Sequence, residues 1–552
     1  MSKLTENFFK NRGIVTQETQ EKFLNPDFEA DLHDPFDFVD MEKAVSRLKK
    51  AIDNNEKILI YTDYDCDGIP AAVILHDFFK KIGYDNFENY IPHRHKEGYG
   101  LHIEAIERYT SNGFTLMITA DLGITNIKEV GFAESNGMNV ILTDHHLPLH
   151  VKNDKGEMVE DLPKAFALIN CQTKREKYAN KGLCGAGTAW KLVNAFLVKH
   201  GEEFNVPKGW EKWLLDMVAL ATVADMMPLT GENRTLVHYG LKVIKKSPRV
   251  GLQKLLALAK EKQKDITEKT ISFTIAPRVN AASRLDHPMK AFYMLSGANK
   301  TMEETIGFAL ELEMINKTRK DTVNDISKYL SNNLSDFDGD DIVFTGSEDW
   351  PIGVAGLIAT KIVEMTGKTT FVWGLDESGT VRGSSRSGED KVSVMDLTAS
   401  IRDSLLHFGG HEMAGGFSFV DGKQEEIGRK LNENYKTLFE GIVTQETDES
   451  KTWHDFQYQG ERLKDIYKEQ EKLSPFGMAN LAPIFKLEGE VKTREFGENK
   501  KHIELSVNNI SIIKWNADKN IKDKIKNAKI FYANLEKDNW KNGHRFMLLD
   551  CE

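Results

Sequence analysis

Acidic and imidazole side chains follow three apolar segments of this 552-residue chain, each at the point where the segment ends. They are Asp63, Asp65 and Asp67 after KILIYT (57–62), Asp121 after LMITA (116–120), and Asp144, His145 and His146 after NVILT (139–143). A further carboxylate, Asp225, ends the apolar stretch ATVAD (221–225). One aspartate after a strand is ordinarily a helix cap or a turn residue, so the chemistry depends on whether these groups meet.

The apolar segments predict neighbouring strands of a parallel sheet, whose carboxyl ends open onto one crevice. Several carboxylates in one crevice would repel each other strongly unless cations neutralise them. Carboxylate oxygens together with imidazole nitrogens suit Mn²⁺ or Mg²⁺, and no cysteine is placed to favour zinc. Two such cations about 3.5–4 Å apart form the usual clamp for phosphoryl hydrolysis. We therefore expect two divalent cations, Mn²⁺ or Mg²⁺, at the ends of these strands.

A second set of motifs, later in the chain, has residue types that suit phosphate. They are APRVNAASR (276–284), GSSRS (383–387) and GGHEMAGGF (409–417). Arginine suits phosphate because its planar fork donates two hydrogen bonds at once. Paired glycines let a backbone approach a phosphate closely. Each motif alone is a weak signal, because a single arginine is usually a surface residue and a glycine pair is often a plain turn.

The elements that must position these groups follow from the hydrophobic pattern. Strands and helices alternate from about residue 51 to 235, which predicts a mostly parallel, doubly wound sheet. Residues 235–335 lack strand patterns and contain a long charged helix near 302–334 that could bridge two lobes. A second α/β pattern follows from 342 to 374, and short strands with polar turns begin near 480 and predict a small barrel.

These patterns predict a multidomain α/β protein with five regions. The predicted regions are a helical lead-in (1–50), the domain with the parallel sheet (51–235), a helical region with the long connecting helix (236–335), a second α/β domain (336–445), and a linker with the barrel (446–552). Within them, the charged segment 421–450 is predicted to be a helix followed by a linker.

Composition excludes several protein classes. Apolar residues make up 40% and charged residues 28% of the chain, which is enough for a sizeable core and argues against disorder. There is no apolar run near the ~18 residues that a membrane span needs, and MSKLTENFFKNRG lacks the apolar core of a signal peptide. The four cysteines show no CxxC spacing. We therefore expect a cytoplasmic protein with no membrane partner.

The net charge of -11 is not distributed evenly, because the last part of the chain is basic and the rest is acidic. Residues 491–552 hold 13 Lys and Arg against 9 Asp and Glu, a net of +4, so the remainder carries -15. A basic module on an acidic body fits polyanion binding. The aromatic residues available there for base stacking are Phe485, Phe496, Trp515, Phe531, Tyr532 and Trp540, most of which we expect in the core.

The motifs DYDCDG, TADLG and TDHH, followed by ATVADMMPL, resemble the four motifs of the DHH phosphoesterase superfamily. They occur in the family's order at strand ends. The later motifs resemble those of the RecJ exonuclease branch, with GGHEMAGGF in a DHHA1 domain and SPFGMANLAPIFKLEGE opening an oligonucleotide-binding (OB) barrel. The resemblance covers nearly the whole chain. It implies a DHH domain, a connecting helix, a DHHA1 α/β domain and an OB-like barrel.

The resemblance also implies roles for single residues. It implies metal ligation and catalysis by Asp63, Asp65, Asp67, Asp121, His145 and Asp225, with Asp121 bridging the two cations. It implies that Asp144 holds the His145 ring, and that His146 faces the scissile phosphate. The implied contacts to substrate phosphates are Arg94, in IPHRHKEGYG, and Arg278, Asn280, Ser385, Arg386 and His411.

The function expected from this resemblance is a metal-dependent 5′→3′ exonuclease. It would degrade single-stranded DNA to mononucleotides in DNA repair or recombination, as a monomer, with a helicase or a single-strand-binding protein as further candidate partners. Two alternatives stay open: a nanoRNA or cyclic-dinucleotide phosphodiesterase of the same superfamily, and a non-catalytic replication scaffold. The length of the chain and the barrel favour a polymeric substrate, and the persistence of every acidic position argues against a scaffold.

Overall fold

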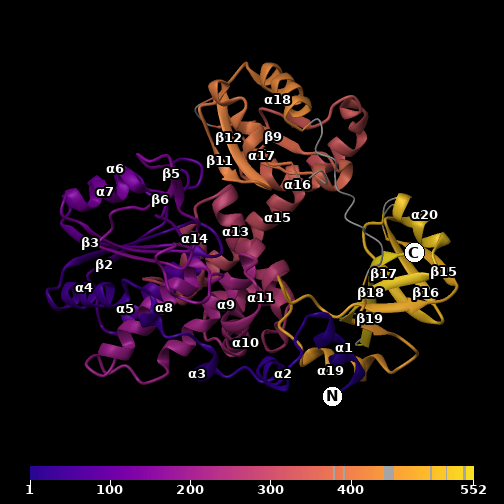
Figure 1. The fold of residues 1–552 in the computed structure, drawn as a ribbon, viewed down its shortest axis with the longest axis horizontal. Coiled ribbons are helices and arrows are strands. Elements are labelled where there is room, and N and C mark those ends of the chain that lie inside the picture. Colours follow the sequence, from indigo (N-terminus) through magenta and orange to yellow (C-terminus); the bar gives the residue numbers. More distant parts are fainter. Residues whose placement is uncertain (377–378, 389–391, 440–452, 498–499, 518, 539–542) are drawn as a thin grey trace. The chain divides into compact units, whose positions relative to one another are not determined.

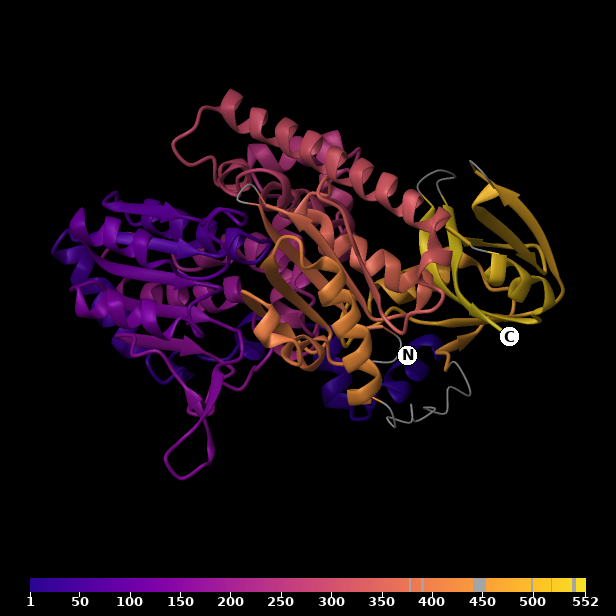
Figure 2. The ribbon, with the colours of Figure 1, turned by 90° about the horizontal axis from the view of Figure 1, so that it is seen from above.

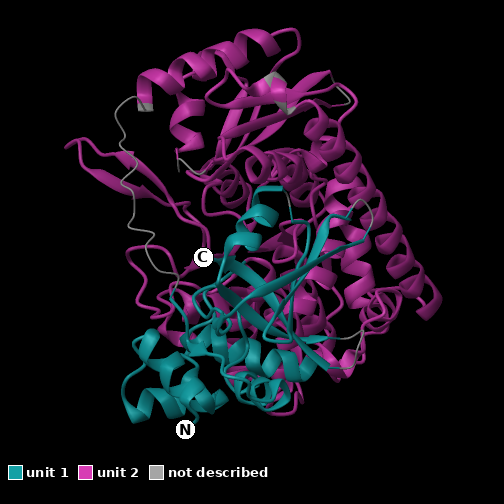
Figure 3. Ribbon diagram, turned by 90° about the vertical axis from the view of Figure 1, so that its right-hand side faces the viewer, with its two compact units in different colours: residues 1–34, 226–243, 446–552 teal, residues 35–225, 244–445 magenta. Residues whose placement is uncertain are grey.

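The computed structural model describes residues 1–376, 379–388, 392–439, 453–497, 500–517, 519–538 and 543–552. The chain divides into two compact units (Figure 3). The barrel unit comprises Met1–Asp34, Met226–Val243 and Glu446–Glu552, and the main unit comprises Pro35–Asp225 and Ile244–Gln445. This division does not follow the five regions predicted from the sequence, whose boundaries stay predictions. Among the described residues, the structure has no helix long and apolar enough to cross a membrane.

The main unit begins with a parallel sheet of strand order β2-β1-β3-β4-β7. Its strands are β1 (Lys57–Thr62), β2 (Phe87–Tyr90), β3 (Phe114–Ala120), β4 (Asn139–Asp144) and β7 (Ala167–Asn170). The surrounding helices are α4 (Met41–Asp53), α5 (Gly68–Lys81), α6 (Ile103–Ser111), α7 (Ile127–Ser135) and α8 (Gly185–His200). Figure 1 shows α6 and α7 on one face of the sheet and α4, α5 and α8 on the other, so the predicted doubly wound sheet is confirmed. A short hairpin, β5 (Leu149–Lys152) and β6 (Met158–Asp161), projects from it.

Strand register brings the ends of the three predicted strands together. Thr62 of β1 pairs with Ala120 of β3, and Ala120 pairs with Thr143 of β4. The strands are buried because they are continuous apolar runs covered on both faces. The residues that follow these three positions therefore leave the sheet side by side at one edge.

Helices follow this sheet. They are α9 (Leu215–Ala224), α11 (Val250–Leu258), α12 (Glu268–Thr270), α13 (Ala276–Leu285), α14 (Met289–Ser296) and α15 (Met302–Asn332), with a π-helical turn at Ile271–Ile275 directly before α13. The long helix predicted near 302–334 is α15, the long rose-coloured helix of Figure 2. It begins with a capping box of Thr301 and Glu304, and its 31 residues span about 46 Å.

A second sheet in the main unit has the strand order β11-β12-β10-β9-β8. Its strands are β8 (Val343–Gly346), β9 (Thr370–Leu375), β10 (Thr380–Arg386), β11 (His407–His411) and β12 (Ala414–Val420). The helices beside it are α16 (Ala355–Thr366), preceded by the turn Ile352–Val354, then α17 (Val394–Ala399) and α18 (Gln424–Phe439). The pair β8–β9 is parallel and the other pairs are antiparallel, which confirms the predicted second α/β pattern. Helix α18 also confirms the helix predicted in 421–450, but the predicted linker falls on 440–452, outside the described residues.

The barrel unit contains a sheet of strand order β13-β14-β18-β19-β17-β16-β15. Its strands are β13 (Phe456–Gln457), β14 (Phe485–Glu488), β15 (Val491–Phe496), β16 (His502–Val507), β17 (Ile510–Lys514), β18 (Ile530–Asp538) and β19 (Gly543–Cys551). Strands β14 and β15 lie at or near opposite ends of this order although only residues 489–490 join them, so the sheet curves round to bring its ends together, as in the predicted barrel. The unit's helices are α1 (Lys3–Asn11), α2 (Gln17–Leu24), α3 (Phe28–Asp31), α10 (Gly231–Ile244), α19 (Leu463–Glu471) and α20 (Lys519–Asn527).

The aromatic residues of the barrel divide between core and surface. Phe485, Phe531 and Tyr532 are buried, as expected for most of them. Trp515 is 38% exposed and contacts the half-buried Phe496 edge to face. Trp540 lies outside the described residues.

Candidate active site

The loop after β1 holds three of the predicted aspartates in a tight turn. Asp65 Oδ1 accepts hydrogen bonds from the amides of Asp67 (2.8 Å) and Gly68 (3.2 Å). Gly68 begins α5, and a Cβ atom there would lie 2.4 Å from the carbonyl oxygen of Asp63. A larger residue would push the loop open, so glycine at this position keeps Asp63, Asp65 and Asp67 together.

Asp121 leaves the end of β3 in an unusual backbone conformation. Its φ of 65° lies in the left-handed region, which residues other than glycine rarely adopt. Its amide donates to the carbonyl of Thr143, near the end of the adjacent strand β4, at 3.1 Å. Gly185 of α8 lies directly against its side chain, because a Cβ atom on Gly185 would be 2.5 Å from the Asp121 Cβ. Close packing therefore fixes where the Asp121 carboxylate lies.

The amino terminus of α8 binds another of the acidic side chains. Gly185 N donates to Asp67 Oδ2 at 2.7 Å, and Ala186 N donates to Asp67 Oδ1 at 2.6 Å. The first amides of a helix have no partner within the helix and carry a partial positive charge. These bonds therefore orient the Asp67 carboxylate, which is only 1% exposed, and offset part of its charge.

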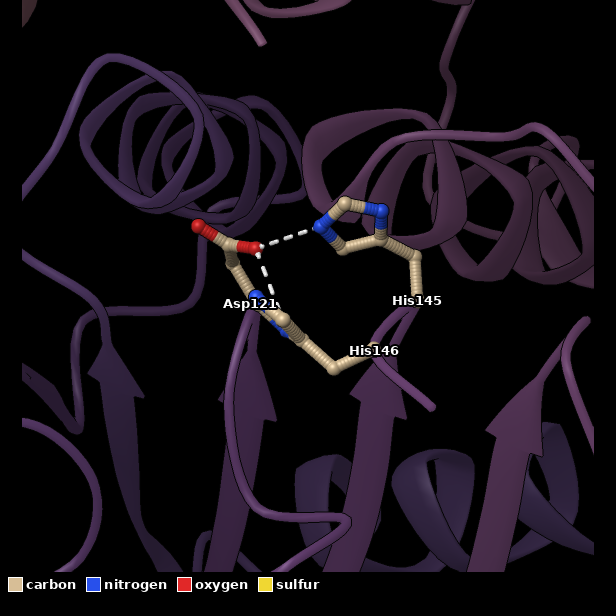
Figure 4. A group of neighbouring side chains, drawn as sticks. All are labelled: Asp121, His145 and His146. Carbon is tan, nitrogen blue, oxygen red and sulfur yellow. Dashed lines mark ion pairs between the residues drawn. The ribbon is translucent and has the colours of Figure 1, made fainter. Parts of the chain in front are cut away.

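The His145 ring points toward the Asp121 carboxylate (Figure 4) and lies close to two further carboxylates. Its Nε2 atom is 3.0 Å from Asp121 Oδ1, 3.5 Å from Asp67 Oδ2 and 3.7 Å from Asp225 Oδ2. Asp225 follows the last residue of α9 rather than a strand. Burial, followed by the charges of the neighbouring Asp67 and Asp65, raises the pKa of Asp225 to about 8.

Asp144 organises the turn that carries both histidines. Its Oδ1 atom accepts from the amides of His145 (2.7 Å) and His146 (3.1 Å), and its Oδ2 atom accepts from the amide of Ile124. The sequence predicted that Asp144 would hold the His145 ring, but the ring placed against it is that of His146, with Nδ1 at 2.8 Å. The His145 ring points away toward the carboxylates instead. Burial raises the pKa of Asp144, but the charge and hydrogen bond of His146 outweigh burial and lower it to about 2.

Several buried oxygen atoms of this cluster accept no hydrogen bond. Among the described side chains these are Asp63 Oδ1, Asp121 Oδ1 and Asp225 Oδ2, although the His145 ring lies close to the last two. Burial and the nearby carboxylates raise the pKa values of Asp63 and Asp121 well above their ordinary range. Carboxylates packed this way need positive charge, and a divalent cation supplies it without adding a proton.

Three sets of ligand atoms are spaced to hold cations. In each set the atoms lie within 4.8 Å of one another, and the sets are Asp63, Asp65 and Asp121; Asp67, His145 and Asp225; and Asp121, His145 and His146. Asp121 belongs to two of them, as a bridging ligand would. Burial raises the pKa values of Cys66 and Cys184 well above the ordinary range, so neither supplies a thiolate. The donors are therefore oxygen and imidazole nitrogen, a set that fits Mn²⁺ or Mg²⁺.

The predicted phosphate contacts on the second sheet lie in one row. Arg386 of β10 pairs with Ala414 of β12, which pairs in turn with the exposed His411 of β11. Arg386 Nη1 donates to the carbonyl of Ser385 at 2.7 Å, and Ser385 Oγ is buried with no hydrogen-bond partner among the residues that the structure describes. Gly356 of α16 makes room for the guanidinium, since a Cβ atom there would be 2.8 Å from Arg386 Nη2.

Arg278 and Asn280 have partners within the protein. Arg278 donates from Nε and Nη2 to Glu313 of α15 (2.6 and 3.2 Å) and from Nη1 to the carbonyl of Thr274 (2.7 Å). A phosphate contact would require Glu313 to give up these bonds, so that role stays a prediction. Asn280 Oδ1 accepts from the amide of Cys66 at 2.9 Å and so supports the acidic loop after β1.

Arginines other than Arg278 and Arg386 complete this side of the site. Arg94, which was predicted, stacks over the Tyr64 ring of the acidic loop at 4.9 Å. Arg284 ends the APRVNAASR motif and donates to the carbonyl of Gly353 at 3.0 Å. Burial, followed by the charges of Arg94, Arg319 and Arg386, lowers the pKa of Arg284 to about 9. The only signal for Arg284 in the sequence was its place in that motif, and Arg319 carried none.

Comparison with known proteins identifies two parts of the chain. The model of the DHH family, N-terminal domain, matches residues 57–222, and the model of the RecJ OB domain matches residues 455–549.

The chain is 33% identical over 516 residues to a single-stranded-DNA-specific exonuclease RecJ from Bacillus subtilis. This match covers 92% of the chain but only 62% of that relative. It is 30% identical to the exonuclease RecJ of Thermus thermophilus, over 91% of the chain and 69% of that relative. The structure of RecJ in complex with Mn²⁺ from the latter organism has the same fold, with a TM-score of 0.78 at 24% identity, over 100% of this chain and 76% of that one.

Proposed function

The chain belongs to the RecJ family of single-stranded-DNA-specific exonucleases, and we propose that it is a metal-dependent 5′→3′ exonuclease that releases mononucleotides from single-stranded DNA. The observation that carries this proposal is the joint placement of the acidic cluster with a group of partly buried arginines. The chain spans 62% of the length of the Bacillus relative. The proposed activity is therefore argued from the residues described above as well as from the activity that the relative's name states.

Two divalent cations would be held by the six residues predicted as ligands. These are Asp63, Asp65, Asp67, Asp121, His145 and Asp225, with Asp121 shared between the cations. When bound, Mn²⁺ or Mg²⁺ supplies the charge that activates water and neutralises a phosphodiester. The buried oxygens of Asp63, Asp121 and Asp225 that accept no hydrogen bond are the atoms that most need such charge. The Thermus structure, which shares the overall fold of this chain, is a complex with Mn²⁺.

The chain's own side chains would orient the substrate. Arg386 and Arg94 would bind the terminal 5′-phosphate, together with the unpartnered hydroxyl of Ser385. His146 binds Asp144 through Nδ1, which leaves Nε2 as the nitrogen that can donate to a non-bridging oxygen of the scissile phosphate. A 5′-phosphate held beside the cation ligands places the first phosphodiester at the cleavage position. This arrangement gives both the 5′→3′ polarity and a one-nucleotide product.

The barrel favours a long strand over a dinucleotide. It matches the OB domain of RecJ and exposes Trp515, with the Arg545 guanidinium 5.5 Å from its ring. Aromatic and cationic groups together are typical of single-strand binding. We also propose that the protein acts as a monomer in the cytoplasm, in DNA repair or recombination. A helicase and a single-strand-binding protein remain the candidate partners.

A time course on one labelled strand tests the proposal. The substrate is a 5′-phosphorylated single strand labelled at its 3′ end, incubated with Mn²⁺, with Mg²⁺ or with EDTA. We expect a ladder of shortening labelled products with either metal, no products in EDTA, and no cleavage of a blunt duplex. The Asp65→Ala variant should yield no ladder, whereas Asp154→Asn, at an exposed turn, should match the wild type. Hydrolysis of dinucleotides with the strand left intact would make the protein a small-substrate phosphodiesterase, and inertness to both would favour the scaffold.

A further inference from the structure

Phe273 is an exposed aromatic residue seven positions before Asn280, whose side chain contacts the acidic loop. Its side chain is 76% exposed, a larger fraction than that of any other large apolar residue among those that the structure describes. It lies in the π-helical turn Ile271–Ile275, whose first and last residues are fully buried. Single exposed apolar residues are common on protein surfaces, so its place relative to the site has to carry the argument.

The helix that contains Phe273 presents one open face. The π-helical turn runs directly into α13, and Phe273, Pro277, Asn280 and Arg284 are spaced by four, three and four residues. Residues at this spacing lie along one side of a helix. All four are at least partly exposed, whereas the intervening Ile275, Ala276, Val279, Ala281 and Ala282 are buried.

Two residues of this face are anchored to the proposed site, in a definite order. At the carboxyl end, Arg284 donates to the carbonyl of Gly353 at 3.0 Å. Gly356, three residues further on, lies against the Arg386 guanidinium. One turn earlier, Asn280 accepts from the amide of Cys66 in the acidic loop. The face therefore passes from the proposed 5′-phosphate residues to the cation ligands and then on to Phe273.

The strand must pass the same features in the same order. Its 5′-phosphate would lie near Arg386, its first phosphodiester at the acidic loop, and its 3′ part beyond that loop. Phe273 precedes Asn280 by seven residues, which is about 10 Å along a helix. Successive nucleotides of a stacked strand are 3.4 Å apart, so this distance spans about three nucleotides.

We propose that Phe273 is the stacking platform for the bases on the 3′ side of the cleaved bond, about two to four nucleotides from the 5′ end. This inference rests on the proposed exonuclease function. It identifies a residue that would hold the part of the strand not yet cut. Stacking on an aromatic ring tolerates every base because each base has a π face. It therefore suits an enzyme that advances along any sequence.

Arg278 braces this platform. Its Nη1 atom donates to the carbonyl of Thr274, the residue after Phe273, and its Nε atom binds Glu313 of the long helix α15. The backbone beneath the ring is thereby tied to a second helix. This contact gives Arg278 a positioning role for the proposed platform, and its phosphate contact stays a prediction.

Steady-state kinetics on a 5′-phosphorylated strand of about 20 nucleotides tests the proposal. Phe273→Ala should raise KM about 5- to 150-fold, the range expected for losing one base stack, and should change kcat by less than about twofold. Phe273→Trp should restore KM. The matched control is Trp213→Ala, because Trp213 is 52% exposed and precedes α9, at the opposite end of that helix from Asp225. This control should leave both constants unchanged.

An abasic scan locates the stacked base. One abasic site is placed in turn at each of the first six nucleotides, and KM is measured for the wild type and for Phe273→Ala. A peak in KM between the second and fourth nucleotides, present in the wild type and absent in the variant, would support the inference. A flat scan with an active wild-type enzyme, or an unchanged KM in Phe273→Ala, would overturn it and leave the exonuclease standing. A wild type that cleaves no strand would instead overturn the proposed function itself.

Discussion

Gly185 and Asp121 are packed so closely that a Cβ atom on the glycine would lie 2.5 Å from the Cβ of the aspartate. The same glycine donates its amide to Asp67 at 2.7 Å. One small residue at the start of α8 therefore positions two proposed cation ligands. This contact joins parts of the chain more than sixty residues apart, and it leads to the first prediction.

Gly185→Ala should lower kcat at least tenfold without unfolding the protein. The added methyl group must displace the Asp121 side chain or the start of α8, and displacements near 1 Å at a catalytic site cost about 10²-fold in rate. The control is Gly131→Ala in α7, where a Cβ atom would have no neighbour within 4 Å. Circular dichroism and kcat are measured for both variants. An alanine at 185 with wild-type kcat would show that Asp121 need not stay where the structure places it.

Metal binding should stabilise the protein in a way that thermal unfolding detects without any substrate. A ligand at 100 times its Kd adds about 2.7 kcal/mol per site, so Mn²⁺ should raise the Tm above that measured in EDTA. Asp121→Asn removes one carboxylate from a crowded, buried group and one ligand shared by two sets. This variant should have a higher Tm than the wild type in EDTA and should lose most of the Mn²⁺ response. An equal response in both proteins would place the cations elsewhere.

Arg386 should govern recognition of the strand terminus. Arg386→Ala should raise KM for a 5′-phosphorylated strand about 10- to 150-fold, the loss expected for a charge-assisted contact of about 1.5–3 kcal/mol. A strand with a 5′-hydroxyl end already lacks this contact, so its KM should change little. Arg429→Ala, at a 66% exposed arginine of α18, serves as the control. If both strands lost affinity equally, Arg386 would act on the chain in general and not on its end.

Arg249 should be essential for the stability of the main unit. It is buried between Asp216 at the start of α9 and Asp77 of α5, with a 2.8 Å contact to each carboxylate. Arg249→Met would leave both carboxylates without their cation, and breaking such a buried pair costs about 3–5 kcal/mol. Denaturant unfolding measures this loss, with Arg429→Met as the exposed counterpart. A change below about 1 kcal/mol would mean that water or other groups compensate these charges.

The sheet and the acidic cluster were predictable from the sequence because local patterns specify both. The segments 57–62, 116–120 and 139–143 are continuous apolar runs, and each became a strand within two residues of its predicted bounds. Parallel strands end at one edge, so the aspartates after them had to meet. Asp225 was also found, although it follows a helix, because its motif resembled that of a known family.

Contacts between distant segments could not be predicted. The binding of Asp67 by α8 amides and of Arg278 by Glu313 depends on how helices pack across the sheet, which no local pattern encodes. Asp144 binds the ring of His146 because the turn after β4 directs the two rings differently. Residue types predicted the chemistry of these groups. Which of them form hydrogen bonds with each other is determined only by how the helices and strands pack.

Gly353 lets two backbone segments of the main unit lie in direct contact. A Cβ atom there would lie 1.8 Å from the carbonyl oxygen of Arg284, so the end of α13 and the turn before α16 touch backbone to backbone. No side chain separates these two backbones, so the end of α13 and the turn before α16 can shift relative to each other only if this contact opens. On the proposed function, the contact would hold the 5′-phosphate residues at a constant distance from the cation ligands. A constant distance of this kind would set the size of the product whatever the sequence of the strand.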